Sequence, residues 1–222
     1  MFFISLFSSL IIVYIFFSLP FTIKNAVGFD LYNFLKKSSI NKDIKLDDFL
    51  FMIGVYHKDF GYKSFVTKSL SLNEETRIVN QFWKYINKKV NNKPCRFYHW
   101  THHEPNVYQK VNNRHGNIWD SINFVDLYNI FKVEPIAIKG SLNFKLKSIA
   151  RAIHDMGHIP TIWDSNNPCA NGMDAMILAY LEYKNNKKVN IKKSVIMRDI
   201  IEYNEKDCDV LYHILEFIRS KK

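Results

Sequence analysis

The sequence predicts an α/β protein in which helices flank a mixed β-sheet. Strand-like segments come first along the chain, and strands and helices then alternate, an order typical of a mixed sheet covered by helices. Hydrophobic residues make up 47% of the 222 residues, which is enough to fill a core. The composition is therefore that of a globular protein rather than a disordered one.

Three strands open the predicted sheet. An apolar segment at residues 26–31 is expected to form the first strand. The continuous apolar run at 49–56 and the alternating run at 61–66 predict a hairpin, because charged residues and a glycine lie between them.

A helix over residues 73–90 is predicted next. Its apolar residues recur at spacings of three and four, and Asn73 precedes Glu74 and Glu75, as expected of a helix N-terminus. The remaining predicted elements are a strand at 95–100, a helix that begins near Pro105, a strand at 123–127, and helices at 142–156, 171–183 and 198–218.

Residues 2–21 carry no charge and are about as many as a helix needs to cross a bilayer. One interpretation is a transmembrane anchor, which by the positive-inside tendency keeps residues 23–222 in the cytoplasm. The alternative is a buried, strand-rich segment, because Ile and Phe also suit the core of a sheet. We expect a hydrophobic segment at 1–22 followed by one domain at 23–222.

The formal net charge of +10 favours a polyanionic partner, either nucleic acid or an anionic membrane surface. The seven glycines lie at least seven residues apart, which excludes the glycine-rich loops of dinucleotide-binding and P-loop proteins. A chain that handles phosphate without such a loop needs side-chain cations, helix N-termini or metal ions. The three cysteines form no C-x-x-C pair, which argues against a zinc site built on cysteines.

Asp207 lies in the middle of the apolar stripe of the last predicted helix. Ile200, Tyr203, Leu211 and Ile214 flank it at spacings of three and four. A carboxylate on a core-facing stripe needs compensation by an arginine, hydrogen bonds, protonation or a metal ion. A simpler interpretation, an aspartate at the edge of the helix bonded to a loop, also stays open.

Two more acidic residues end strand-like segments. Asp30 closes an apolar run, and Glu104 follows the strand at 95–100, directly before a helix. Carboxylates at neighbouring strand ends, facing a carboxylate on a packed helix, form the kind of site that binds hard divalent cations. Asp126, in a later strand, is either a fourth member of this group or the start of the next turn.

The segment YNEKD, from Tyr203 to Asp207, resembles the Tyr-x-x-x-Asp third motif of the DEDD 3′–5′ exonucleases. From Phe51 to the C-terminus the chain also resembles the YprB-type exonuclease domains that are associated with RecB-like nucleases. The blocks that carry this resemblance are FMIGVYH, YKSFV, FYHWTHHEPNVY, FVDLYNIFKVEPIAIKGSLNFKLKSIA, TIWDS and MRDIIEYNEKDCDVL. The resemblance implies a ribonuclease-H-like fold.

The resemblance also implies roles for individual residues. Asp30, Glu104 and Asp207, with Asp126 as a weaker candidate, would bind two Mg²⁺ or Mn²⁺ ions. Tyr203 would orient or deprotonate the attacking water.

The first motif of that family, Asp-x-Glu, is incomplete in this chain. Tyr32 stands where the family has Glu if Asp30 is the first acid. In the alternative register Gly28 and Asp30 fill the two positions, and the first acid is then missing. In both registers one of four carboxylates is absent.

The expected function is metal-dependent 3′–5′ exonucleolytic hydrolysis of DNA by a two-metal mechanism. The alternative is a catalytically degenerate member of the same fold that binds nucleic acid or acts as a scaffold, with or without a membrane anchor.

Basic and aromatic residues predict a surface for DNA with a single-stranded 3′ end. Lysines gather before the last helix and between residues 139 and 151, in runs that are also typical of a solvated face. Trp100 suits base stacking beside Glu104, and nearby histidines suit phosphate contact, although packed histidines are common at strand ends. The predicted nucleic-acid-binding residues are His99, Trp100, His103, Lys139, Lys192, Lys193 and Arg198.

Overall fold

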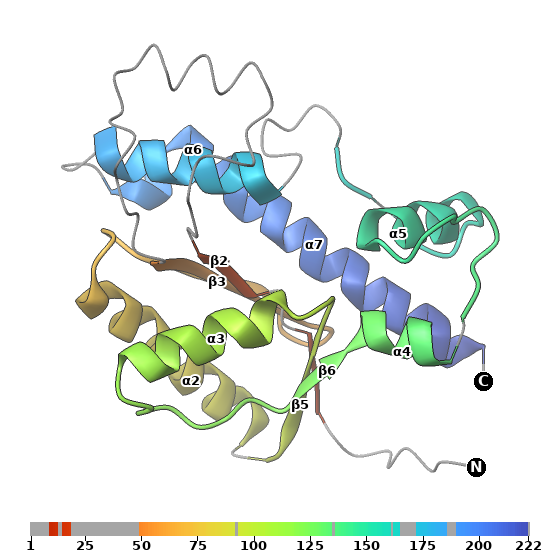
Figure 1. The fold of residues 1–222 in the computed structure, drawn as a ribbon, viewed down its shortest axis with the longest axis horizontal. Helices are drawn as coiled ribbons and strands as arrows, with labels where there is room; N and C mark the ends of the chain where they lie inside the picture. The colour runs from red at the N-terminus through yellow and green to blue at the C-terminus, as the bar shows by residue number, and fades with distance from the viewer. Residues whose placement is uncertain are drawn as a thin grey trace.

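The computed structural model is an α/β fold with helices on both faces of one β-sheet (Figure 1), which confirms the predicted fold class. It describes residues 9–12, 15–18, 49–91, 93–134, 136–160, 162–164, 172–185 and 190–221. The strands are β1 (Ser9–Ile12), β2 (Ile15–Ser18), β3 (Leu50–His57), β4 (Gly61–Val66), β5 (Cys95–His99) and β6 (Phe124–Asp126). The helices are α2 (Leu72–Val90), α3 (His103–Arg114), α4 (Leu127–Val133), α5 (Leu146–Asp155), α6 (Gly172–Asn185) and α7 (Val195–Ser220), with a 3₁₀ turn, η2 (Ile191–Lys193), before α7.

Strand β3 organises the sheet. β4 pairs with it antiparallel on one side, and β1 and β2 follow one another along its other side, also antiparallel. β1 pairs in parallel with β5, where Ile12 lies opposite Tyr98, and β5 pairs in parallel with β6. The sheet therefore combines antiparallel strands at one edge with parallel strands at the other.

The N-terminal hydrophobic segment contributes two strands to this sheet. β1 and β2 both lie within residues 2–21. The described residues of this segment are therefore strands and not part of a helix, as the strand-rich alternative predicts, because Ile and Phe favour extended, sheet-forming backbone. Among the described residues, no helix is both long and apolar enough to span a membrane. The predicted first strand at 26–31 lies outside the described residues.

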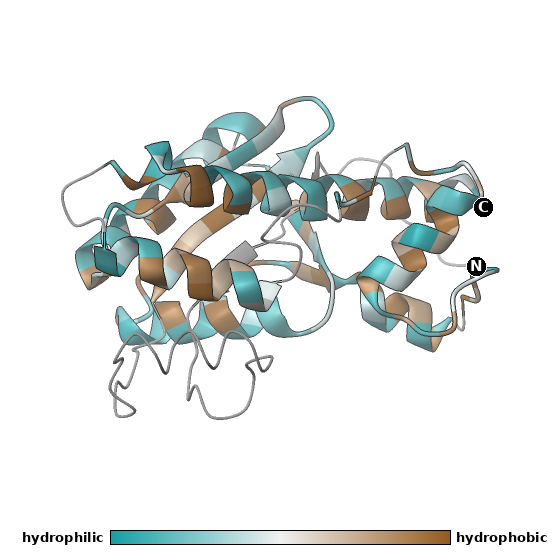
Figure 2. Cartoon of the chain, turned by 90° about the horizontal axis from the view of Figure 1, so that it is seen from above, coloured by the Kyte–Doolittle hydropathy of each residue, from teal (hydrophilic) through white to brown (hydrophobic). Residues whose placement is uncertain are grey.

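Helices cover both faces of the sheet around β3. α2 and α3 lie on one face, and α6 and α7 lie on the other (Figure 1). Ile53 and Val55 of β3 pack in the core under α2, whereas Met52 packs in the core under α6 and α7. Figure 2 shows hydrophobic and hydrophilic residues alternating along these helices, as expected of helices with one buried face.

The predicted hairpin and the helix after it are confirmed. β3 and β4 pair directly, with His57 opposite Gly61 at the turn. The helix α2 begins slightly earlier than predicted, because Ser71 rather than Asn73 is its N-cap and accepts the backbone N–H of Glu74.

A further core forms where α4, α5 and the C-terminal half of α7 meet the end of β5. Its most deeply buried members include Leu127, Phe131, Ile149, Ile153, Leu211 and Ile214. The sequence predicts no helix at α4. Leu127, the first residue of α4, falls in the strand predicted at 123–127. Asp126 instead ends β6 and caps α4, since its Oδ1 accepts the backbone N–H of Tyr128 at 2.9 Å.

Gly54 allows α7 to approach β3 closely. A Cβ atom at this position would lie 1.7 Å from Asn204 Oδ1, so a larger residue does not fit. Asn204 Oδ1 also accepts a hydrogen bond from the Tyr62 hydroxyl at 2.8 Å, which joins α7 to β4. These contacts fix the middle of α7, and with it Asp207, against the sheet.

Candidate functional site

Asp207 is buried at the middle of α7, as its place in the apolar stripe predicts. Only 2% of the residue is exposed. Its Oδ1 accepts a hydrogen bond from the indole N–H of Trp163 at 2.7 Å. The hydroxyl of Tyr203, one turn earlier on α7, donates a second hydrogen bond to the same carboxylate. Two aromatic side chains therefore hold the orientation of Asp207.

The surroundings of Asp207 disfavour its charged form. Burial raises the pKa of Asp207 from 3.8 to about 8, although the Trp163 hydrogen bond and the Lys147 ammonium oppose this rise. The charge of Glu104 raises the pKa further, so the two carboxylates interact. A buried carboxylate whose pKa is raised by burial and by a neighbouring charge is typical of functional sites.

Glu104 comes to the same site from the first turn of α3. It is 1% exposed, and burial raises its pKa. The Nδ1 atom of His99 lies 3.6 Å from Glu104 Oε2, which is too long for a good hydrogen bond. Within the described part of the chain, neither of these two atoms has a hydrogen-bond partner. A buried carboxylate oxygen in this state is costly, and a bound cation would satisfy it.

Trp163 and Lys147 complete the surroundings of Asp207. The Nζ atom of Lys147, in the first turn of α5, lies 5.3 Å from the ring centroid of Trp163 and 5.3 Å from that of Tyr203. Burial lowers the pKa of Lys147, and the charge of Asp207 opposes this. We call Glu104, Lys147, Trp163, Tyr203 and Asp207 the carboxylate cluster.

Sequence reasoning missed two members of this cluster. The sequence predicts no function for Trp163, although this residue lies within the TIWDS block. Lys147 is included only as one of the basic residues between 139 and 151. Trp163 is 44 residues from Asp207 along the chain, so no local spacing connects the two. A tryptophan, which carries an N–H donor, within the TIWDS block was the available signal.

The cluster contains part of the predicted metal-binding set. Glu104 and Asp207 supply carboxylate oxygens, the ligands that hard divalent cations prefer, and Glu104 Oε2 is available to a cation. Among the described residues, no group of three or more metal-binding side chains occurs. Asp30 and Tyr32 lie outside the described residues, so the third predicted ligand stays a prediction.

Asp126 has a structural role. Its Oδ1 accepts the backbone N–H of Thr101 at 2.9 Å as well as that of Tyr128. Of the two interpretations left open by the sequence, the structure favours the start of a turn over a fourth metal ligand.

The predicted aromatic contact with DNA is not supported at Trp100. This residue is 4% exposed, its indole N–H donates to the backbone carbonyl of Phe144 at 3.1 Å, and its ring packs against Phe131. Base stacking needs an accessible ring face, so we correct this assignment. His99 is also buried and lies beside Glu104, whereas His103 is exposed at the start of α3.

The predicted basic residues lie at the surface. Lys139, Lys192, Lys193 and Arg198 are all exposed. Burial, followed by the charges of Lys63 and Arg77, lowers the pKa of Lys192. The charges of Lys63 on β4 and Arg77 on α2 therefore both act on Lys192, and Arg77 is itself paired with Glu74. The exposed lysines Lys63 and Lys192 are the kind of cations that bind a polyanion.

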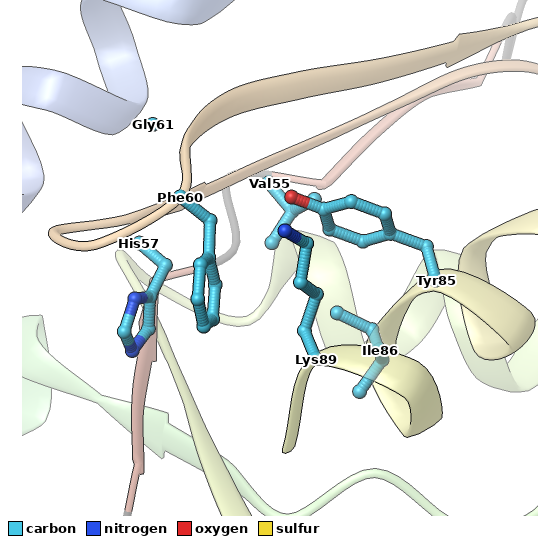
Figure 3. A pocket seen from close by; sticks show the side chains of 7 residues that line it. All are labelled: Val55, His57, Phe60, Gly61, Tyr85, Ile86 and Lys89. Carbon is cyan, nitrogen blue, oxygen red and sulfur yellow. The ribbon is translucent and has the colours of Figure 1, made fainter. Parts of the chain in front are cut away.

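A separate small pocket lies at the turn between β3 and β4 (Figure 3). It is lined by Val55, His57, Phe60, Gly61, Tyr85, Ile86 and Lys89. The Phe60 ring stacks on His57 with centroids 4.4 Å apart, and Lys89 Nζ lies 4.4 Å from the Phe60 centroid. The pocket has room for about one water molecule, so it is too small for a nucleotide.

Comparison with protein families matches residues 28–219 to a family of the RNase H superfamily. The matched region contains both carboxylates of the cluster and begins after β2. Neither the curated proteins nor the solved structures include a match to this chain. Because the family match covers most of the sequence, the chain belongs to the RNase H superfamily.

Proposed function

We propose that this protein is a metal-dependent nuclease that shortens DNA from a single-stranded 3′ end. The observation that carries the proposal is the pair of buried carboxylates, Glu104 on α3 and Asp207 on α7, in a chain of the RNase H superfamily. Nucleases of this superfamily generally use divalent metals such as Mg²⁺. The polarity and the DNA substrate rest on the resemblance of Tyr203 to Asp207 to the third motif of the DEDD exonucleases.

The chemistry assigns a role to each residue of the cluster. Glu104 and Asp207 would hold Mg²⁺ or Mn²⁺, which when bound lowers the pKa of water and stabilises the leaving oxygen. The Tyr203 hydroxyl, bonded to Asp207, is placed to orient a water molecule beside that carboxylate. The Trp163 hydrogen bond fixes the Asp207 carboxylate in one orientation, as outer partners of metal ligands commonly do.

The test uses the full chain and a 5′-labelled single-stranded DNA with Mn²⁺ or Mg²⁺. We expect a ladder of products shortened from the 3′ end. Glu104→Gln and Asp207→Asn should each abolish the ladder, because each removes a carboxylate of the pair. Asp209→Asn is the matched control, since Asp209 lies on the same helix but pairs with Lys206 and His213.

Two results would contradict the proposal. One is the absence of cleavage by the parent chain with either metal. The other is cleavage that persists in both Glu104→Gln and Asp207→Asn, which would indicate a contaminating nuclease.

A second candidate function is DNA binding without hydrolysis. It is favoured by the incomplete first motif, in which Tyr32 stands where the related exonucleases have Glu if Asp30 is the first acid. For this candidate we expect the parent chain to bind the labelled DNA without cutting it, and Tyr32→Glu to gain Mn²⁺-dependent cleavage.

A further inference from the structure

Lys147 is set beside the carboxylate cluster by the packing of α5. The neighbouring residues Leu146, Ile149 and Ala150 are buried in the core formed with α4 and α7. Their burial fixes the first turn of α5, while Lys147 itself remains exposed to solvent. The position of its backbone is therefore determined by the core.

Two aromatic rings determine where the ammonium group of Lys147 lies. Its Nζ is 5.3 Å from the centroids of both Trp163 and Tyr203, a range in which a cation is attracted to an aromatic ring. These are the same two side chains that donate hydrogen bonds to Asp207. The positive charge of Lys147 also acts on the buried Asp207 carboxylate, whose charged form it favours.

This arrangement suits a phosphate group that approaches the cluster from solvent. In their ionised forms Glu104 and Asp207 repel a phosphodiester unless a cation offsets their charge. The sequence contains no glycine-rich loop to bind phosphate with backbone N–H groups, so side chains must supply the contact. A lysine ammonium is a common partner for phosphate oxygens.

We infer that Lys147 binds a non-bridging oxygen of the phosphodiester group that enters the carboxylate cluster, with Trp163 and Tyr203 holding its ammonium group in place. This inference rests on the proposed function, because it presumes a nucleic-acid substrate. The inference adds Lys147 to the proposed site as a residue that binds substrate through its positive charge. Glu104 and Asp207 cannot take this role, because they are acidic.

The test is equilibrium binding of a fluorescently labelled oligothymidine to the full chain, in EDTA to stop hydrolysis and again with Ca²⁺. Lys147→Met should weaken binding about tenfold, because it removes a charged hydrogen bond. It should also reduce the slope of log K against log salt by about 0.7, as expected for one contact to single-stranded DNA. Lys147→Arg, which keeps the charge, should stay within about threefold of the parent.

Lys145→Met is the matched control. Lys145 lies two residues earlier, is exposed, and carries the same charge. It reports the general electrostatic effect of losing one lysine near α5, for which we expect less than about a twofold change.

A chemically modified DNA tests which phosphate Lys147 contacts. A methylphosphonate at the 3′-terminal linkage removes the charge of that phosphate, so it should weaken binding to the parent by about the same factor as Lys147→Met. The modification should have no further effect on the Lys147→Met variant, because the two partners belong to one contact.

The outcomes separate the inference from the proposed function. Equal effects of Lys147→Met and Lys145→Met, or additive effects of Lys147→Met and the methylphosphonate, would overturn the inference while leaving DNA binding in place. A parent chain that does not bind the oligothymidine in EDTA or with Ca²⁺ would overturn both.

Discussion

Gly54 on β3 and Asn204 on α7 are in such close contact that a Cβ atom on Gly54 would lie 1.7 Å from the Asn204 side-chain oxygen. This contact brings the long C-terminal helix directly onto the sheet. Asp207 lies three residues beyond Asn204, so the same contact fixes the depth at which this carboxylate is buried.

Gly54→Ala should lower the free energy of unfolding by roughly 1–3 kcal/mol, because the new methyl group forces α7 away from β3. Urea unfolding followed by circular dichroism measures the change. The double variant Gly54→Ala/Asn204→Ala should lose less than the sum of the two single variants, since the second substitution removes the atoms that clash. Strict additivity would show that the close contact does not exist in solution.

The parts of the fold that depend on local pattern could be predicted from the sequence. The β3–β4 hairpin follows from two apolar runs around a polar turn, and the burial of Asp207 follows from the helical spacing of its neighbours. The place of β1 between β3 and β5 could not be predicted from the sequence. Residues 9–12 belong to a uniformly apolar segment that suits a helix as well as a strand, and their pairing with β3 and β5 joins segments that are distant along the chain.

Of the residues around Asp207, some could likewise be predicted from local sequence and others could not. Glu104 could be proposed from its place at the end of a strand, because strand ends meet at one edge of a sheet. Trp163 could not, since its hydrogen bond to Asp207 joins segments 44 residues apart. Trp100 was predicted to stack on bases because it lies near Glu104 in the sequence, whereas its ring is buried in the core with α4.

Trp163→Phe should reduce the rate of DNA cleavage about 10- to 100-fold, as is typical when an outer partner of a metal ligand is lost. The phenylalanine ring keeps most of the packing but cannot donate a hydrogen bond to Asp207 Oδ1. Initial rates on single-stranded DNA measure the effect. Trp119→Phe is the matched control, because the Trp119 indole donates to Asn80 away from the cluster and its loss should leave the rate unchanged.

Equal rates for the Trp163→Phe variant and the parent would contradict the positioning role of Trp163. The melting temperature of both tryptophan variants should be recorded as well. A large fall for Trp163→Phe alone would mean that the indole serves the fold rather than the site.

Lys192→Ala should weaken binding of single-stranded DNA by about three- to tenfold, with the loss greatest at low salt. Burial and then the charges of Lys63 and Arg77 lower the pKa of Lys192. Since Arg77 is paired with Glu74, Lys63 is the neighbouring cation that adds to the positive charge of this surface. Affinity measured at several salt concentrations tests this. Lys84→Ala removes an exposed lysine from the middle of α2 and should change the affinity much less. Equal effects of both substitutions would indicate a general charge effect rather than a binding surface at η2.

Glu74 should make the stability of the domain depend on pH in the acidic range. Both of its carboxylate oxygens accept hydrogen bonds from Arg77, at 2.8 and 2.7 Å, and Arg77 also donates to the Val66 carbonyl at 2.8 Å. These hydrogen bonds therefore connect the first turn of α2 to the end of β4. The hydrogen bonds from Arg77 lower the pKa of Glu74 below its usual 4.5, so the charged form is the one that stabilises the fold.

Because the folded-state pKa of Glu74 is lowered, its contribution is present above pH 4.5 and is lost as the pH falls through the lowered value. Glu74→Gln should lower the free energy of unfolding by roughly 0.5–1 kcal/mol at neutral pH. The difference from the parent should shrink as the pH is reduced below 4.5, where the parent carboxylate also becomes protonated. Urea midpoints measured across this range test the prediction, with Glu216→Gln as a control, because the Glu216–Arg219 pair has the same helical spacing but is far more exposed. A difference that stays constant with pH would show that the packing of the side chain matters and its charge does not.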